Sequence, residues 1–500
     1  MQKERLVQRK SMAINGVFSF AAKVVAMLIP FMVYPYVMRA LGAESFGKVT
    51  YVESLISYFS LFAILGIGTY AQRECSVRRD DPIGLQQVAS RSFALNLIMT
   101  VVSFIIYLCL CFFVPNMKSE RPLFLVFSLW IVASGLSLEW LYTAQERFDL
   151  VSIREIVAKV LYLILCFIFV KSNDSYLIFG IIVVFTSTVF PMLWNIIGIL
   201  KGECGVVPNL RFSTGFTDCL KPVLFLALLT IGSKLFTDFD VLMIKWFIPN
   251  DNDKAVGLYN SAILLPKALD VLLMTVSAVV TPKLFIATRK NDEKRVVEIM
   301  NKTSNALFLI AIPSIITCLI FSKEILLLFA GFEYVTAAPV LQIYSLIIFG
   351  VLVITLAGTR TYIARQKEQK LFCILICGAV LNIIFNYIFI RVYGIIGAAL
   401  ATMCAYVVVM FVELTLEKSW HYIFTYDKFK YLIASIFLIV VYLISKRYFC
   451  YSSDIVFAII LAGLLYTIVL FVMRESTLLQ VYKKVNGILK KKYEGKKDTI

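Results

Sequence analysis

A small set of charged residues interrupts long apolar stretches of this sequence and carries most of its chemical information. A charge inside a membrane costs several kcal/mol, so it generally faces a water-filled cavity or an ion partner. Lysine ammonium groups bind phosphate as point charges. The set therefore predicts a partly cationic, hydrated cavity for an anionic headgroup, above all a phosphate or pyrophosphate. Its members are Lys23, Glu53, Glu139, Lys234, Asp238, Asp240, Lys245, Lys267, Asp270 and Glu413.

The spacing of these charges leaves a second interpretation open. Lys234 and Asp238 are four residues apart, one turn along a helix. Lys245 falls within about 20° of Lys234 around the same helix axis. Lys267 and Asp270 form another pair three residues apart. Such pairs either line the cavity or neutralise buried helices locally, with lysines near the helix ends reaching the membrane surface.

The apolar stretches are the elements that must position these charges. Hydrophobic residues make up 60% of the 500-residue chain and charged residues 16%, with a mean hydropathy of +0.84, whereas soluble domains have roughly 45–50% and 25%. The apolar residues come in blocks of about 20, the length of a membrane-crossing helix. The sequence therefore predicts an all-α polytopic membrane protein with about 14 transmembrane helices. The predicted spans are residues 13–38, 46–71, 89–114, 122–142, 152–171, 175–200, 221–248, 257–282, 303–322, 336–358, 370–390, 394–416, 430–446 and 454–473.

Basic residues predict the orientation of these spans. With the N-terminus in the cytoplasm, most of the 49 Lys and Arg residues fall in cytoplasmic segments, as the positive-inside rule requires. We therefore expect an inner-membrane protein with both termini cytoplasmic. The first span is predicted to be retained, because it is long and lacks a signal-peptide cleavage site. The net charge of +17 is explained by topology and by attraction to anionic membrane lipids.

Several functions are disfavoured by residues that the sequence lacks. His421 is the only histidine, which argues against His-based triads and zinc or haem sites. No GxxxxGK[ST] loop occurs, and the connections between spans are too short for a catalytic domain. The 11 cysteines are scattered, as buried apolar residues would be. We expect no enzyme activity, no metal, no cofactor and no nucleic-acid partner.

An internal repeat predicts two lobes. Lys23 recurs at Lys234, and Gly47, which opens the second span, recurs at Gly257, which opens the eighth, at almost the same offset. Lys23 has no acidic residue one turn away in its own helix, which favours a cavity position. The alternative is chance similarity between apolar helices. The predicted parts are an N-terminal lobe of six spans (1–205), a C-terminal lobe of six spans (206–416), two extra spans (417–473) and a basic cytoplasmic tail (474–500).

Five strings carry a resemblance to a known family. In order they are YPYVMRALGAESFGKVTY (34–51), ILGIGTYAQRE (64–74), EWLYTAQERFDLVSIR (139–154), TDFDVLMIKWFIPNDNDKAVGLY (237–259) and NIIFNYIFIRVYGIIGAALAT (382–402). Together they resemble the bacterial polysaccharide transporter family. This family contains the O-antigen and capsule repeat-unit flippases of the multidrug/oligosaccharidyl-lipid/polysaccharide exporter superfamily.

The resemblance implies both an architecture and a substrate. The fold would be two six-helix lobes around a central cavity, plus two C-terminal helices. The substrate would be an undecaprenyl-pyrophosphate-linked oligosaccharide, flipped from the cytoplasmic to the outer leaflet by alternating access for surface polysaccharide assembly. A proton or sodium gradient would drive it, and other polysaccharide-assembly membrane proteins would be partners. The family's acidic positions match Asp240 and Glu139, the latter followed by Trp140.

Aromatic and amide side chains are candidates for contacts with sugar rings and hydroxyls. These candidates are Tyr34, Tyr58, Trp140, Tyr142, Asn382 and Asn386. One rival function is a drug/cation antiporter of the same superfamily, against which Lys23 and Lys234 count. Another is the polymerase that joins repeat units, which would need a large outer loop. A scaffolding protein is hard to reconcile with so many charges inside spans.

Overall fold

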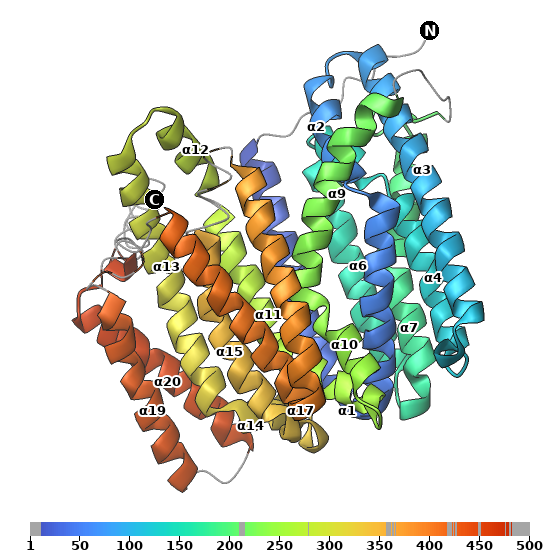
Figure 1. Cartoon of the computed structure of the whole chain (residues 1–500). Helices are drawn as coiled ribbons and strands as arrows, with labels where there is room; N and C mark the ends of the chain where they lie inside the picture. Colours follow the sequence, from blue (N-terminus) through green and yellow to red (C-terminus); the bar gives the residue numbers. More distant parts are fainter. Residues whose placement is uncertain are drawn as a thin grey trace, which may run out of the picture. The chain divides into compact units, whose positions relative to one another are not determined.

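The computed structural model describes residues 12–209, 216–278, 280–356, 367–417, 428–448 and 452–475, with isolated positions elsewhere. Over these ranges the chain forms helices and no strand, as Figure 1 shows. The predicted all-α class is confirmed, and within the described residues the predicted apolar blocks fall mostly on helices. Of the predicted basic tail, almost all lies outside the described residues.

Nine helical stretches in the described ranges are long and apolar enough to cross a membrane. Two of them, Leu28–Val77 with 50 residues and Gln369–Leu416 with 48, would extend about 75 Å and 72 Å at a rise of 1.5 Å per residue. That is more than twice the roughly 30 Å of bilayer hydrocarbon. Each contains a glycine with non-helical dihedral angles, Gly42 or Gly394, where the chain can reverse. The chain is a multi-pass membrane protein, and the count of 14 spans stays a prediction.

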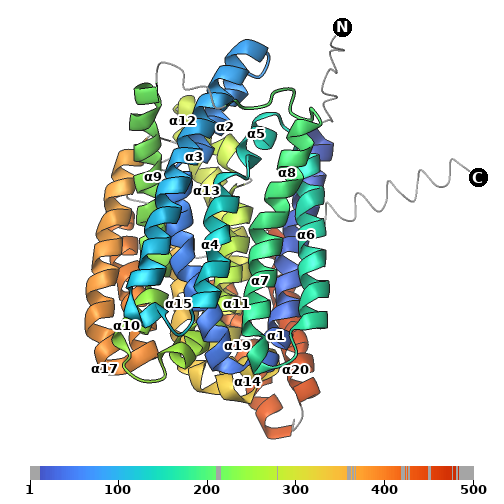
Figure 2. The ribbon, with the colours of Figure 1, turned by 90° about the vertical axis from the view of Figure 1, so that its right-hand side faces the viewer.

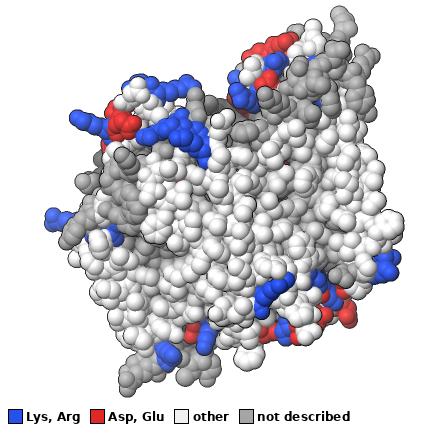
Figure 3. Space-filling view, in the orientation of Figure 1, with Lys and Arg blue, Asp and Glu red and all other residues white. Residues whose placement is uncertain are grey.

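On the outer surface, most charged side chains lie near the ends of the helices. On the face seen in Figure 3, Lys, Arg, Asp and Glu gather at two opposite edges, and the band between them is uncharged. Large apolar side chains are exposed along the middle of the helices. Examples, each about half exposed, are Ile105, Ile164, Ile436 and Leu464. In water such a surface would be unfavourable, whereas it matches the hydrocarbon of a bilayer.

The described chain divides into two compact units. The N-terminal unit consists of Met1–Asn260 and Phe329–Glu333, and the C-terminal unit of Ser261–Leu328 and Tyr334–Ile500. In the N-terminal unit, α1 packs against α3, α4 and α6, and Figure 2 shows α7 and α8 as one continuous column. Its helices are α1 (Met12–Ile64), α2 (Ile67–Val77), α3 (Pro82–Phe113), α4 (Arg121–Gly135), α5 (Glu139–Ala144), α6 (Phe148–Phe169), α7 (Tyr176–Val184), α8 (Phe190–Leu200), α9 (Phe216–Asp238) and α10 (Asp240–Phe247), and α11 (Asn252–Ala278) begins there.

Local sequence explains where several of these helices begin and end. Gly66, with φ of 71°, separates α1 from α2, because glycine adopts left-handed angles without strain. Asp81 caps α3 through a hydrogen bond from the Ile83 amide, with Pro82 at the first helical position. Leu138, at φ of 50°, separates α4 from α5. These breaks place α5 at the end of α4, where its buried side chains join the core of the unit.

The C-terminal unit is built on a second apolar core. Leu307, Ile348, Leu352 and Ala458 are buried at its centre, and α13 packs against α15 and α19. Pro313 lies inside α13, where it removes one backbone hydrogen bond. Besides α11, the helices are α12 (Thr281–Arg289), α13 (Glu293–Ile320), α14 (Ser322–Phe329), α15 (Ala338–Val353), α17 (Glu368–Glu417), α19 (Phe429–Tyr448) and α20 (Ser452–Val472).

Candidate functional site

Charged side chains of three helices come together inside the N-terminal unit. Lys234 of α9 forms an ion pair with Asp238, with 2.6 Å between Nζ and Oδ2, and the two side chains are 30% and 23% exposed. Glu53 of α1 interacts electrostatically with Lys234 and with Lys159 of α6. Two ammonium groups and two carboxylates are therefore gathered among apolar helices. We call Glu53, Lys159, Lys234 and Asp238 the charge cluster.

Phenol groups surround the charge cluster. The Lys159 ammonium lies 5.9 Å from the centre of the Tyr162 ring. Tyr162 and the partly buried Tyr34 both interact electrostatically with Glu53. Tyr58 donates a hydrogen bond of 3.4 Å to the Lys234 carbonyl. The cluster thus offers ammonium and hydroxyl donors to an anion or a sugar, and carboxylates that can accept hydrogen bonds.

The helix that carries Lys234 is interrupted one residue beyond Asp238. Helix α9 ends at Asp238, and α10 begins at Asp240. The buried Asp240 carboxylate accepts a hydrogen bond of 2.6 Å from the hydroxyl of Tyr259 in α11, which is also fully buried. Asp240 therefore connects α10 to α11. Its predicted role in ion coupling stays a prediction.

Two glycines allow α1 and α11 to cross in backbone contact. A Cβ atom on Gly47 would lie on the Asp253 carbonyl oxygen and 2.8 Å from the Gly257 nitrogen. A Cβ atom on Gly257 would lie on the Ala43 carbonyl oxygen and 3.1 Å from the Gly47 nitrogen. The contact is reciprocal at a constant offset, as two copies of one motif related by a two-fold axis require. The predicted match of Gly47 with Gly257 is thus a direct contact, which we call the glycine crossing.

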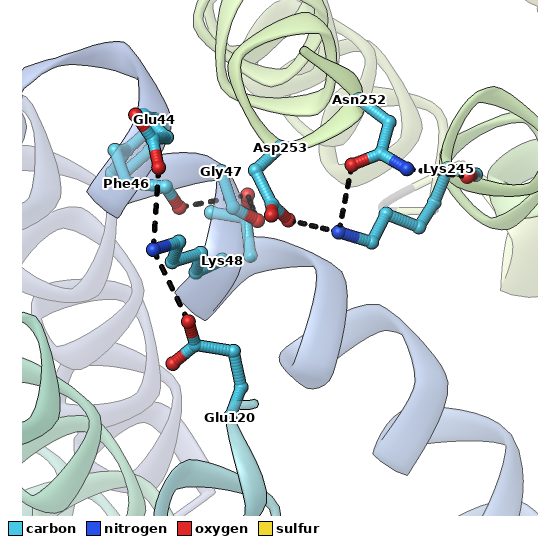
Figure 4. A network of polar contacts seen from close by, with 9 residues as sticks. Glu44, Phe46, Gly47, Lys48, Glu120, Lys245, Asn252 and Asp253 are labelled. Carbon is cyan, nitrogen blue, oxygen red and sulfur yellow. Dashed lines mark hydrogen bonds and ion pairs between the residues drawn. The ribbon is translucent and has the colours of Figure 1, made fainter. Parts of the chain in front are cut away.

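Ion pairs flank the glycine crossing (Figure 4). Lys245 pairs with Asp253 and donates a hydrogen bond of 3.0 Å to the Asn252 side chain. On the other side, Lys48 lies 3.3 Å from Glu44 and 3.1 Å from Glu120. Lys245 is therefore held at the turn between α10 and α11 by these contacts, and its predicted role in a cationic cavity stays a prediction.

Glu139 lies in a polar network where α5, α6 and α8 meet. Arg154 is buried and donates to the Glu139 carboxylate at 2.8 Å and to the Asn195 side-chain oxygen at 2.9 Å. Tyr142, also buried, donates to the Asn195 carbonyl at 3.0 Å. The Trp140 ring is 7% exposed, and its Nε1 finds no hydrogen-bond partner in the described part of the chain. Glu139 itself is about half exposed (48%), so the network presents one carboxylate at its surface.

The remaining predicted residues lie in the C-terminal unit. Asp270 interacts electrostatically with Lys267, and its Oδ1 is buried without a hydrogen bond to any described residue. Asn382 and Asn386 are fully buried in α17. Asn382 donates to the Thr402 hydroxyl at 3.1 Å, and Asn386 donates to Asn382 at 2.8 Å. These amides join the two halves of α17, and their predicted contact with sugars stays a prediction.

The structure adds two functional candidates that sequence reasoning missed. Lys159 and Arg154 lie in the predicted span 152–171 but were not among the predicted intramembrane charges. Lys159 lies eleven residues after the first residue of α6. At that distance from the helix end, its position in the sequence could have predicted a charge inside the membrane. The side chain of Lys23 lies outside the described residues, as do its contacts. No group of three or more His, Cys, Asp or Glu able to hold a metal occurs in the described ranges.

Comparison with known sequences gives a consistent set of matches. A family model described as polysaccharide biosynthesis protein matches residues 13–286, more than half of the chain. A relative from Shigella dysenteriae, whose given name is that of an O-antigen transporter, is 22% identical over 402 residues, covering 78% of this chain and 96% of the relative. A second relative, named as a low-salt glycan biosynthesis flippase (Agl15, Haloferax volcanii), is 27% identical over 181 residues, 36% of this chain and 37% of that one.

Solved structures share the fold. The lipid II flippase MurJ superimposes with a TM-score of 0.69 at 18% identity, covering 92% of this chain and 98% of that one. A multidrug resistance transporter of the MATE family superimposes with a TM-score of 0.62 at 16% identity, covering 80% and 97%. At these identities the likeness establishes a common polytopic transporter fold, which agrees with the predicted fold class.

Proposed function

The chain belongs to the polysaccharide biosynthesis protein family, and on this premise we propose that it flips lipid-linked oligosaccharides across a bacterial inner membrane. The substrate is an undecaprenyl-pyrophosphate-linked repeat unit, moved from the cytoplasmic to the outer leaflet for O-antigen, capsule or exopolysaccharide assembly. Both chain termini lie in the cytoplasm. The chain carries its substrate without chemical change, so it is not an enzyme. The names of its relatives, an O-antigen transporter and a glycan flippase, support this proposal.

The charge cluster is the observation that carries the proposal. A pyrophosphate with attached sugars cannot enter hydrocarbon unaided, because unpaired charges there cost several kcal/mol each. The Lys234 ammonium is 30% exposed, so an incoming phosphate can compete with Asp238 for it. The second ammonium, that of Lys159, also interacts electrostatically with Glu53, and its side chain is partly exposed. Two cations that share carboxylates can thus release them and bind a diphosphate.

The carboxylates have a complementary role in this proposal. Glu53 and Asp238 neutralise the lysines when no substrate is bound, and uptake of a proton or sodium ion by either would free the lysines for phosphate. Lys23 would add a third cation from the N-terminal lobe, and Lys267 a fourth from the C-terminal lobe. We keep the two lobes at residues 1–205 and 206–416 as part of the proposal, with the substrate path between them. Asp240, Asp270 and Glu139 remain candidates for coupling.

Exchange of the two residues of one ion pair tests the cationic role directly. In a strain that lacks its own flippase, Lys234→Gln should lower export of surface polysaccharide at least about tenfold, because a hydrogen bond to a charged group contributes about 1.5–3 kcal/mol. The exchanged variant Lys234→Asp/Asp238→Lys keeps the pair but moves the cation by one turn, and it should stay defective. Lys201→Gln, at an exposed lysine after α8, is the matched control and should export normally.

Two results would contradict this proposal. Full export by the exchanged variant, at normal protein level, would mean that Lys234 serves only as an ion-pair partner. The second readout is the leaflet position of the lipid-linked repeat unit in cells without the protein. We expect it on the cytoplasmic leaflet. Repeat units that are already flipped but not joined would identify the chain as a polymerase instead.

A further inference from the structure

The two halves of α17 enclose an apolar groove in the C-terminal unit. Figure 1 shows the two halves in orange, meeting at a bend, where Gly394 has φ of 58° and ψ of −133°. The groove has a volume of about 200 Å³, and no lining side chain carries a charge. The lining residues are Cys373, Ile374, Cys377, Gly378 and Leu381 on the first half, and Val408, Val409 and Val412 on the second.

The position of the groove determines what can fill it. Its residues lie within Gln369–Leu416, one of the membrane-crossing stretches. Cys373 and Cys377 are exposed, and Val408 and Val412 are each 38% exposed. The groove therefore opens to the hydrocarbon of the bilayer, and its occupant is itself hydrocarbon. A volume of about 200 Å³ is below the roughly 300–1,000 Å³ of pockets for drug-sized ligands, so it takes part of one chain and no sugar.

A cation continues the line of the groove toward the membrane surface. Lys370 is exposed and lies at the start of α17. It precedes Cys373, Ile374 and Cys377 by three, four and seven residues, the spacing of one helix face. Cys373, the nearest lining residue, lies about 5 Å from Lys370 along the helix axis. An anion beside Lys370 would therefore sit at the end of a hydrocarbon chain that lies in the groove.

We propose that this groove holds the prenyl chain of a polyprenyl phosphate carrier lipid, with its phosphate beside Lys370. The inference rests on the proposed function, because it gives the lipid tail of the substrate a binding site. A polyprenyl phosphate has one chain with methyl branches, which suits a groove for one chain, whereas a diacyl phospholipid has two. The small side chains of Cys373, Cys377 and Gly378 leave space for the branches.

Photocrosslinking to the full-length protein tests the proposal. The probe is a polyprenyl phosphate with a diazirine in its chain, in nanodiscs of phosphatidylethanolamine and phosphatidylglycerol, and the labelled peptides are mapped by mass spectrometry. We expect label on residues 373–381 or 408–412. Cys377→Phe fills the groove and should abolish this label. Cys109→Phe, the same change at an exposed cysteine of α3, is the matched control and should leave it unchanged.

A second variant keeps the test valid should the first misfold. Lys370→Gln should lower labelling about fivefold, since one lysine near a membrane surface changes the affinity for an anionic lipid by about that factor. Lys290→Gln, at another exposed lysine, should not. Unlabelled polyprenyl phosphate should compete with the probe, and added phosphatidylglycerol should not.

Two outcomes would overturn the inference. Labelling of α17 that survives Cys377→Phe would place the chain elsewhere, and equal competition by phosphatidylglycerol would make the groove an ordinary lipid contact. Export of surface polysaccharide by the unmodified chain is measured separately and tests the proposed function alone. Normal export without label in the groove would therefore refute the groove and leave the flippase function standing.

Discussion

Replacement of Gly47 by alanine should separate two helices that now touch through their backbones. The added Cβ would fall on the Asp253 carbonyl oxygen and 2.7 Å from its carbon. These atoms belong to the peptide backbone, so no side chain can turn away to make room. Helix α11 would have to move, and the hydrogen bond of 3.0 Å that Asn260 donates to Thr50 would be lost with it.

The magnitude follows from three contributions. Overpacking of a close contact costs about 1–3 kcal/mol. The lost hydrogen bond between Asn260 and Thr50 costs about another 1 kcal/mol. Alanine gains at most about 1 kcal/mol over glycine in helix propensity. The net destabilisation is therefore about 1–3 kcal/mol, which corresponds to a decrease in Tm of about 3–10 °C for a unit of this size.

The assay is thermal unfolding of the purified protein in detergent, with a glycine control. Gly463 lies in α20, and a Cβ there would meet nothing within 4 Å, so Gly463→Ala should leave Tm unchanged or slightly raised. Gly257→Ala should match Gly47→Ala. The double variant should cost less than the sum, because both changes open the same contact. A Tm of Gly47→Ala equal to that of Gly463→Ala would refute the close crossing.

Two further predictions concern polar groups outside the glycine crossing. Arg154→Met should lower the stability by about 2 kcal/mol and Glu139→Gln by about 1 kcal/mol or less, because Arg154 is buried whereas half-exposed Glu139 is screened by water. In the same thermal assay Arg154→Met should therefore lower Tm more, and equal effects would contradict the network. Burial raises the pKa of the Glu475 carboxyl, but hydrogen bonds from the Leu478 and Thr477 amides and the Tyr431 hydroxyl outweigh it and lower the pKa below its ordinary value. This stabilisation is present above the pKa of the unfolded chain and is lost as pH falls through the lower, folded pKa. Between about pH 6 and pH 3 the Tm of the unchanged protein should fall more than that of Glu475→Gln, and parallel curves would remove Glu475 as the cause.

Sequence reasoning located individual elements well. The apolar blocks of about 20 residues fall on helices because backbone polar groups in lipid have to bond within their own segment. That constraint is local, so it can be read from the sequence. The pair Lys234 and Asp238 was predicted for the same reason, since residues four apart on a helix are neighbours. Their distance of 2.6 Å agrees with that expectation.

Contacts between distant segments were decided by the fold. Lys159 was not among the predicted intramembrane charges, but α6 packs along α1 and lets Lys159 interact electrostatically with Glu53. Lys245 was predicted either to line a cationic cavity or to form a local ion pair, and the turn between α10 and α11 brings Asp253 to it as a partner. Sequence periodicity fixes which face of a helix a residue occupies, but not which helix lies opposite.

The glycine crossing depends both on residues that the sequence identifies and on a contact that only the tertiary structure shows. By itself the sequence determined that the chain is helical and membrane-spanning, because hydropathy and local hydrogen bonding depend on neighbours along the chain; the internal repeat stays a prediction. It also marked Gly47 and Gly257 as equivalent positions. Only the tertiary structure decided that these equivalents touch each other. Their contact requires two helices to approach at one angle and depth, and that geometry is set by the packing of the whole unit.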